Sequence, residues 1–218
     1  MKRFILGIVL LLVTLPGLGQ TKSPLLIGID VLKPVLSVAT PNRPAFRLAE
    51  LTVKVPRQYG SYLSVVGGYG QMRSDTTFRN VLMNLQGGYL KVGVESVTER
   101  GFIKGFHGLA AFSNESADYV FSGPNFGDYR AIALRQNRVA VGIEGFLAHQ
   151  TPLSKRFLLR MSARATLAGM VGNRTDKIPV VFAPGVGLVT GDPIMYSVGV
   201  GVHLLYQTNT RPIATPQQ

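Results

Sequence analysis

The stretch RFLLRMSARATL, residues 156–167, decides the fold class because its side chains alternate in character. Apolar residues such as Phe157, Met161 and Leu167 occupy every second position, and three arginines stand among the positions between them. Successive side chains of a β-strand point to opposite sides of the sheet. This period of two therefore predicts a strand with one apolar face and one polar face.

Two further stretches repeat the pattern clearly, VAVGIEGFLA at 139–148 and YSVGVGVHLLY at 196–206. No stretch has the spacing of an amphipathic helix. Clusters of glycine, proline and polar residues separate the alternating segments and indicate turns. Weaker alternation predicts five more strands, at 27–38, 47–55, 62–70, 81–95 and 102–112.

The pattern thus predicts an all-β fold, a single antiparallel up-and-down β-barrel of about eight strands. The two longest connections, 113–137 and 169–194, leave room for short strands at 179–183 or 185–189, so ten strands is the second possible count. Only 16% of the residues are charged and there are no cysteines. This composition argues against a disordered chain, a coiled coil or a disulfide scaffold.

The N-terminus has the layout of a secretory signal peptide. Lys2 and Arg3 precede an apolar run from 4 to 13, and Gly17 and Gly19 stand before a possible cleavage point. A retained anchor is the alternative, but the run is shorter than the roughly 20 residues that span a bilayer. We expect a signal peptide at 1–19, a barrel at 20–207 and a flexible tail at 208–218.

Alternation alone fits a soluble barrel with an apolar interior as well as a membrane barrel with apolar residues facing lipid. The polar faces favour the second, because they mix small residues with isolated ionisable groups, whereas a soluble surface carries charge at roughly 25–35% of its positions. Aromatic residues near the ends of the apolar faces are typical of an interfacial girdle. We therefore expect a transmembrane barrel in the outer membrane, with a periplasmic or secreted soluble barrel as the alternative.

An eight-stranded barrel is just wide enough to hold its own side chains. Its inward charges should pair, since an unpaired ion in a nearly dry lumen costs several kcal/mol. We expect the glutamates to be the partners of Arg160, Arg164 and Lys91. The predicted lumen network consists of Asp30, Glu50, Lys91, Glu95, Glu144, Arg160, Arg164 and His203.

The net charge is +12, with 23 basic and 11 acidic residues. A nucleic-acid partner is not expected, because the basic residues are spread over strands and turns rather than interleaved with aromatics on one platform. The positive excess instead suggests contact with outer-membrane lipid, including anionic headgroups, and an unknown envelope protein remains a further possible partner. The candidate lipid-facing basic residues are Arg130, Arg135, Arg138, Lys155, Arg174 and Lys177.

Short glycine-rich motifs carry a resemblance to a known family. They are GIDVLKP at 28–34, GYG at 68–70, GGY at 87–89 and PGVG at 184–187, together with Glu50 and with Glu144 in the strand before Arg160. On these motifs the chain resembles an uncharacterised family of small exported outer-membrane β-barrel proteins of Gram-negative bacteria. It is also similar in architecture to eight-stranded outer-membrane barrels. The resemblance implies an outer-membrane location and no defined activity.

Two of the three histidines, His107 and His203, are weak candidates for catalysis, whereas His149 precedes Gln-Thr-Pro and indicates a turn. His203 faces the predicted lumen, and His107 lies with Ser113 and Glu115 near a predicted strand end. Neither has motif spacing that identifies a hydrolase, and the histidines show no metal-ligand spacing. We expect no cofactor and no metal. The leading hypothesis is a non-enzymatic barrel with a plugged polar lumen and a structural, surface or lipid-contacting role. One alternative is a lipid-modifying hydrolase that uses a rim or lumen histidine. The other alternative is a secreted soluble barrel that binds an apolar ligand.

Overall fold

The computed structural model describes residues 24–39, 45–57, 60–73, 81–98, 100–121, 123–124, 127–171, 182–188 and 194–208. The predicted signal peptide and nearly all of the predicted tail lie outside these residues. None of the helices in the described part of the chain is long and apolar enough to cross a membrane.

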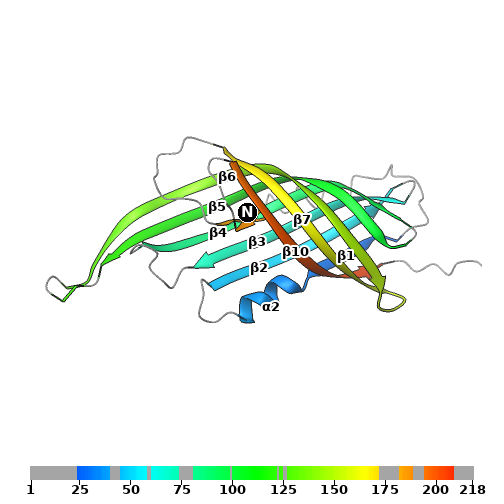
Figure 1. Cartoon of the computed structure of the whole chain (residues 1–218), viewed down its shortest axis with the longest axis horizontal. Coiled ribbons are helices and arrows are strands. Elements are labelled where there is room, and N and C mark those ends of the chain that lie inside the picture. Colours follow the sequence, from blue (N-terminus) through cyan, green and yellow to red (C-terminus); the bar gives the residue numbers. More distant parts are fainter. Residues whose placement is uncertain are drawn as a thin grey trace, which may run out of the picture.

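Eight antiparallel strands close into a barrel in the order β1-β10-β7-β6-β5-β4-β3-β2 (Figure 1). This confirms the all-β class and the count of eight strands in the barrel wall. The wall strands are β1 (Leu26–Asp30), β2 (Ala45–Pro56), β3 (Ser61–Arg73), β4 (Val81–Val97), β5 (Phe102–Phe121), β6 (Tyr129–Pro152), β7 (Phe157–Val171) and β10 (Ile194–Gln207).

The two ends of the barrel differ in the length of their connections. Short turns follow β2, β4 and β6, and the first and last strands begin and end at the same side. We call this the short-turn end. The connections after β1, β3, β5 and β7 are longer and meet at the opposite, long-loop end.

The strand expected at 27–38 ends at Asp30, the last residue of β1, and the rest of that range is corrected to a helix, α2 (Leu32–Ala39). Asp30 ends β1, and its Oδ1 accepts hydrogen bonds from the backbone N–H groups of Leu32 and Lys33 at 2.9 and 3.1 Å. A side chain that accepts from the first free N–H groups starts a helix. Pro34 is tolerated in the first turn because no backbone donor is needed there.

Because β1 is short, it separates β2 from β10 only near the short-turn end. Its residues pair with 203–207 of β10 and with 51–54 of β2. Beyond Asp30, the described part of β2 pairs with β3 and that of β10 pairs with β7. There α2 contacts both β2 and β10. The wall is therefore interrupted by a helix on this side.

Within the segments considered as extra wall strands, the described residues instead form a small hairpin, β8 (Phe182–Ala183) and β9 (Gly187–Leu188). Phe182 and Val186 are each only 2% exposed. Phe182 packs with Met72 and Leu85, which are inward residues of β3 and β4. The hairpin thus fills the lumen at the long-loop end.

Strands β5 and β6 continue as a hairpin that projects past the rest of the barrel (Figure 1). This corrects the expected long connection at 113–137, since β5 runs to Phe121 and β6 begins at Tyr129. The pairing includes a register shift between Ala117 and Asp118.

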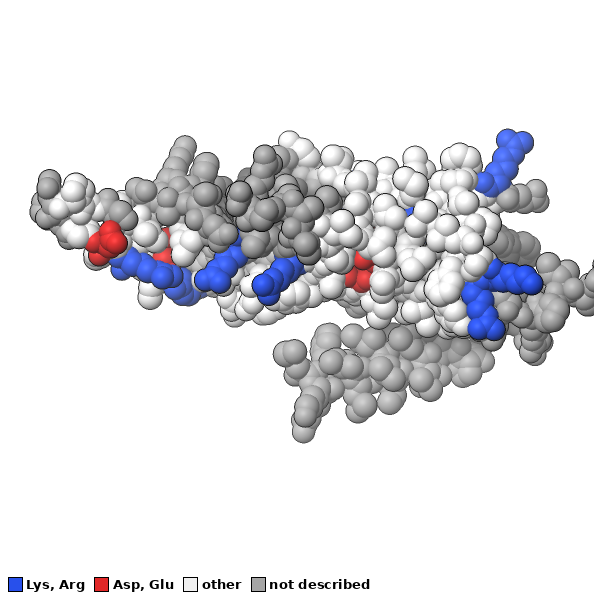
Figure 2. Space-filling model, turned by 90° about the horizontal axis from the view of Figure 1, so that it is seen from below, with Lys and Arg blue, Asp and Glu red and all other residues white. Residues whose placement is uncertain are grey.

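The apolar faces of the strands point outward and the polar faces point inward. Val198 and Ile143, for example, are 85% and 62% exposed, whereas Lys91 and Arg160 are 1% and 4% exposed. A soluble barrel has the opposite arrangement. Figure 2 shows a band of almost uncharged surface between groups of Lys and Arg nearer the two ends. The exposed described basic residues are Arg57, Arg100, Lys104, Lys155 and Arg156 near the short-turn end, and Arg47, Arg73, Arg130 and Arg135 near the long-loop end.

Candidate functional site in the barrel lumen

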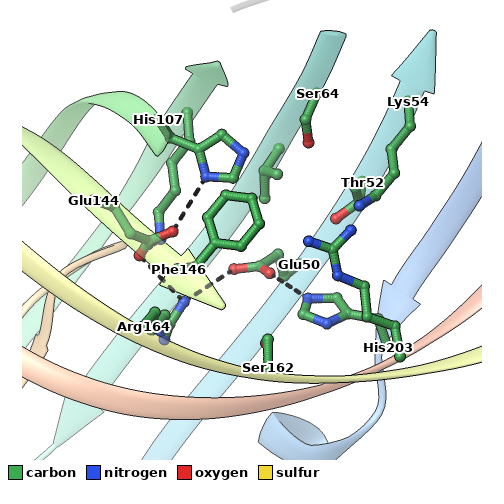
Figure 3. A pocket seen from close by; sticks show the side chains of 13 residues that line it. Glu50, Thr52, Lys54, Ser64, His107, Glu144, Phe146, Ser162, Arg164 and His203 are labelled. Carbon is green, nitrogen blue, oxygen red and sulfur yellow. Dashed lines mark hydrogen bonds and ion pairs between the residues drawn. The ribbon is translucent and has the colours of Figure 1, made fainter. Parts of the chain in front are cut away.

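The lumen has three layers. Leu26, Leu158 and Leu205 form one apolar cluster at the short-turn end, and Ile103, Phe146 and Ala148 form a second. The hairpin β8–β9 packs with Val66, Leu109, Met195 and other inward residues near the long-loop end. Buried charged side chains occupy the space between these apolar layers and constitute the candidate functional site (Figure 3).

The first cluster surrounds Glu50 on β2. Its carboxylate accepts hydrogen bonds from Lys33 Nζ at 2.5 Å and from the Tyr89 hydroxyl at 2.5 Å, and it lies 2.9 Å from His203 Nε2. Lys33 Nζ also lies 3.1 Å from Asp30 Oδ2. This lysine belongs to α2, so the helix that interrupts the wall is connected to the lumen by a buried ion pair.

Glycine at position 68 makes this arrangement possible. Gly68 on β3 is paired in register with Tyr89 on β4. A Cβ at position 68 would stand 2.2 Å from the Tyr89 ring, which crosses over the glycine. The absence of a side chain at Gly68 therefore lets the Tyr89 hydroxyl reach Glu50.

The second cluster surrounds Glu144 on β6. Its carboxylate accepts hydrogen bonds from Lys91 Nζ at 2.6 Å and from Thr166 Oγ1 at 3.0 Å, and it lies 3.3 Å from His107 Nδ1. The guanidinium of Arg164 stands between this cluster and the first, 3.7 Å from Glu144 and 3.9 Å from Glu50. Arg164 therefore joins the two clusters by charge, as Figure 3 shows.

The third cluster has Glu95 on β4 at its centre. Lys54 Nζ lies 2.7 Å from each carboxylate oxygen, and Arg160 Nη1 lies 2.8 and 3.1 Å from them. Arg160 also stacks over the Phe146 ring at 5.1 Å. The single carboxylate of Glu95 is thus the counter-ion of two buried cations, Lys54 and Arg160.

The structure places all eight residues of the predicted network in this layer. The partners of Arg160, Arg164 and Lys91 in the structure are Glu95, Glu50 and Glu144. Sequence reasoning did not include Lys33, Lys54 or Tyr89 in the network. Alternation along the strands could have identified two of them, because Lys54 lies on the same face of its strand as Glu50, and Tyr89 on the same face as Lys91. Lys33 could not be identified in this way, because it lies on the unexpected helix.

His107 does not lie near a strand end, where the sequence placed it. It is an inward residue of β5, 5% exposed, and its ring stacks on Phe146 with centroids 4.7 Å apart. Arg138 also differs from the expectation of a lipid-facing loop residue. It is 9% exposed and pairs with Glu115 at 2.6 Å inside the barrel. Arg174 and Lys177 lie outside the described residues.

A metal-like grouping exists among the described residues, formed by Asp30, Glu50 and His203, whose ligand atoms lie within 4.8 Å of one another. The ammonium group of Lys33 lies between the two carboxylates at 3.1 and 2.5 Å. These carboxylates therefore already have a cation supplied by the chain itself, and the geometry is that of an ion-pair cluster.

Neither a known protein family nor a curated protein matches this chain. The resemblance to small exported outer-membrane barrels consequently remains a prediction from the glycine-rich motifs.

Proposed function

We propose that this protein is an outer-membrane β-barrel with a closed, charge-paired lumen, acting as a structural or lipid-contacting component of the envelope rather than as a pore. The observation that carries the proposal is the reversed distribution of polarity, apolar outside and ionic inside. Lipid is the environment in which an exposed belt of valine, isoleucine, leucine and aromatic side chains is stable.

Strand length and connections support the same proposal. The outward apolar positions run from Phe157 to Leu167 on β7 and from Tyr196 to Tyr206 on β10, within the roughly 9–11 residues that a tilted strand needs to cross a bilayer. Aromatic residues stand near the ends of these spans, and Phe157 contacts Tyr206 with centroids 5.4 Å apart. Short turns at one end and long loops at the other are typical of outer-membrane barrels.

The layered lumen supports a non-conducting barrel. A water-filled channel needs a continuous polar path, whereas here apolar clusters and the β8–β9 hairpin lie on either side of the charged layer. The exposed basic residues near the two ends would lie at headgroup level and contact anionic lipid.

Fractionation and conductance test this proposal. The chain, expressed with its own N-terminal segment in a Gram-negative host, should be recovered in the outer-membrane fraction and should migrate differently on detergent gels before and after heating. Purified protein should give no steady conductance in planar bilayers. Recovery in the soluble periplasm would overturn the membrane assignment, and stable single-channel currents would overturn the closed lumen.

A second candidate function, hydrolysis of a lipid ester, is favoured by one observation at Gly201. A Cβ on this glycine would stand 3.0 Å from both Ser162 Oγ and His203 Cε1, so both side chains lie beside Gly201, where Ser162 Oγ donates a hydrogen bond to the Gly201 carbonyl oxygen at 3.4 Å. His203 Nε2 is held by Glu50, and its buried Nδ1 has no hydrogen-bond partner. A hydroxyl, an imidazole and an orienting carboxylate are the groups that activate a serine nucleophile, and activation here requires Ser162 Oγ to turn from the Gly201 carbonyl to His203 Nδ1.

In that reaction Ser162 Oγ would attack the ester carbonyl while His203 Nδ1 takes its proton. The proton would then pass to the departing alcohol, and water would release the acid. A long-chain fluorophosphonate should label the wild type and not Ser162→Ala, while the control variant Ser113→Ala should label normally. Absence of labelling in the folded wild type would reject this candidate and leave the first proposal intact.

A further inference from the structure

A small cavity lies within the charged layer and is lined by residues from β2, β3, β5, β7 and other strands (Figure 3). Its volume is about 40 Å³, enough for a very few water-sized particles. Four buried side-chain atoms of the lining residues have no hydrogen-bond partner: Thr52 Oγ1, Ser64 Oγ, His107 Nε2 and His203 Nδ1. Thr52, Ser64 and His107 are only 3%, 1% and 5% exposed, and the His203 side chain is 13% exposed. Buried polar groups are normally satisfied, so these atoms indicate an occupant.

The charge around the cavity indicates the sign of that occupant. Apart from His107 and His203, the ionisable residues that line it are the cations Lys54, Lys91, Arg160 and Arg164 and the anions Glu50 and Glu144. Counting the three described clusters together, with histidines neutral, the five cations exceed the four carboxylates by one charge. These residues are Lys33, Lys54, Lys91, Arg160 and Arg164 against Asp30, Glu50, Glu95 and Glu144.

The surplus positive charge lies closest to the hydroxyl groups of Thr52 and Ser64. Lys54 and Arg160 share the single carboxylate of Glu95. Lys54 is paired in register with Ser64, and Thr52 is the preceding inward residue on the same strand. Two hydroxyl donors thus lie beside cations that are only half neutralised.

His107 and His203 face the same cavity with different chemistry. Because Glu144 accepts from His107 Nδ1 and Glu50 accepts from His203 Nε2, the neutral rings present acceptors at His107 Nε2 and His203 Nδ1, which repel an anion. An anion would therefore lie toward Thr52 and Ser64 rather than against these rings.

We propose that the cavity binds one small monovalent anion of halide size, chloride under natural conditions. The Thr52 and Ser64 hydroxyls donate hydrogen bonds to it, and the surplus charge of the Lys54–Arg160 pair attracts it. An unbalanced charge in a closed lumen is costly, so the anion completes the ion-pair network. The cavity volume excludes sulfate and phosphate esters with their substituents. The proposal is independent of whether lipid surrounds the barrel.

Crystals of the mature chain grown with bromide in place of chloride give a direct test. An anomalous bromine peak within hydrogen-bond distance of Thr52 Oγ1 and Ser64 Oγ is expected. Water density alone at that position, with no anomalous signal, would overturn the proposal.

Solution stability gives the second test and shows whether binding occurs only at crystal concentrations. The mature chain in nonionic detergent should show an unfolding midpoint that rises with chloride or bromide by about 2–5 °C per tenfold increase above the dissociation constant. Gluconate at equal ionic strength should have no such effect.

A matched pair of variants identifies the site. The double variant Thr52→Val/Ser64→Ala should lose the halide dependence, whereas Ser113→Ala, which removes a buried inward hydroxyl outside this cavity, should keep it. Equal halide dependence in all three proteins would overturn the proposal. If the double variant does not fold, the presence or absence of the anomalous bromine peak in wild-type crystals decides whether the anion binds.

Discussion

The chain places carboxylate–cation pairs in two regions with opposite surroundings, the lumen and the projecting β5–β6 hairpin. In the lumen, Glu95 and Arg160 are 3% and 4% exposed. On the hairpin, the Asp118 side chain is 9% exposed but pairs with Arg130 and Arg135, whose side chains are 63% and 48% exposed. Water can therefore hydrate the hairpin arginines when their carboxylate partner is removed, whereas it cannot hydrate the buried cations of the lumen. The same chemistry should therefore be essential to folding inside the barrel and nearly neutral outside it.

Removing the charge of Glu95 should have the largest effect. Glu95→Gln leaves Lys54 and Arg160 without a counter-charge, and breaking a buried pair in this way costs about 3–5 kcal/mol. Urea unfolding followed by far-ultraviolet circular dichroism measures it, since the chain contains no tryptophan for fluorescence.

The control for Glu95 removes the cations together with the carboxylate. Replacing Lys54 and Arg160 with Met and Glu95 with Leu should recover much of the lost stability, because apolar replacements of a buried ion cluster are often nearly neutral. A triple variant less stable than Glu95→Gln would contradict the view that the unpaired charges cause the loss.

Charge placed on the outward face should have the next largest effect, if lipid surrounds the barrel. Ile143 is an outward residue of β6, 62% exposed. In lipid vesicles Ile143→Arg should cost about 2–4 kcal/mol if it lies near the bilayer midplane. Leu153→Arg, in the short turn before β7, should cost close to nothing. Equal small losses for both variants would favour a soluble barrel.

Filling the space at Gly68 should have a moderate effect. Gly68→Ala would push the Tyr89 ring away from Glu50, and overpacking of this kind costs about 1–3 kcal/mol. Gly67 is the ideal control because a Cβ there meets nothing within 4 Å. Urea unfolding should show Gly67→Ala close to wild type. A comparable loss in both variants would show that strand glycines act through the backbone rather than through Tyr89.

Most of the barrel could be predicted because alternation is a local property. The strands around 156–167 and 196–206 carry a period of two that does not depend on distant residues, and their inward side chains follow from it. The helix α2 was missed because LKPVLSVA is short, although Asp30 and Pro34 were available as helix-start signals. The β5–β6 extension was missed because polar residues such as Asn114 and Ser116 resemble a loop.

The pairings inside the lumen depend on more than alternation. Alternation along each strand predicts that Glu95 and Arg160 face inward. Which inward residues lie at the same level along the barrel axis depends on the stagger between the strands around the barrel. The insertion of β8–β9 into the lumen and the entry of Lys33 from α2 depend on tertiary packing alone. No local pattern in the sequence reports them.

The smallest predicted effect concerns Asp118 and its dependence on pH. Hydrogen bonds from Arg130 and then Arg135 hold the pKa of Asp118 below its ordinary value of about 3.9. A lowered pKa in the folded state stabilises the protein above the unfolded-state pKa, and this stabilisation is lost as pH falls through the folded-state pKa. The unfolding midpoint of the wild type should therefore slightly exceed that of Asp118→Asn near neutral pH, and the difference should vanish in acid.

Since the two arginines are exposed to water, the difference in unfolding midpoint between the wild type and Asp118→Asn should also shrink with added salt. A difference as large as that of Glu95→Gln, or one that persists in acid, would mean that the hairpin pair is shielded like the lumen pairs.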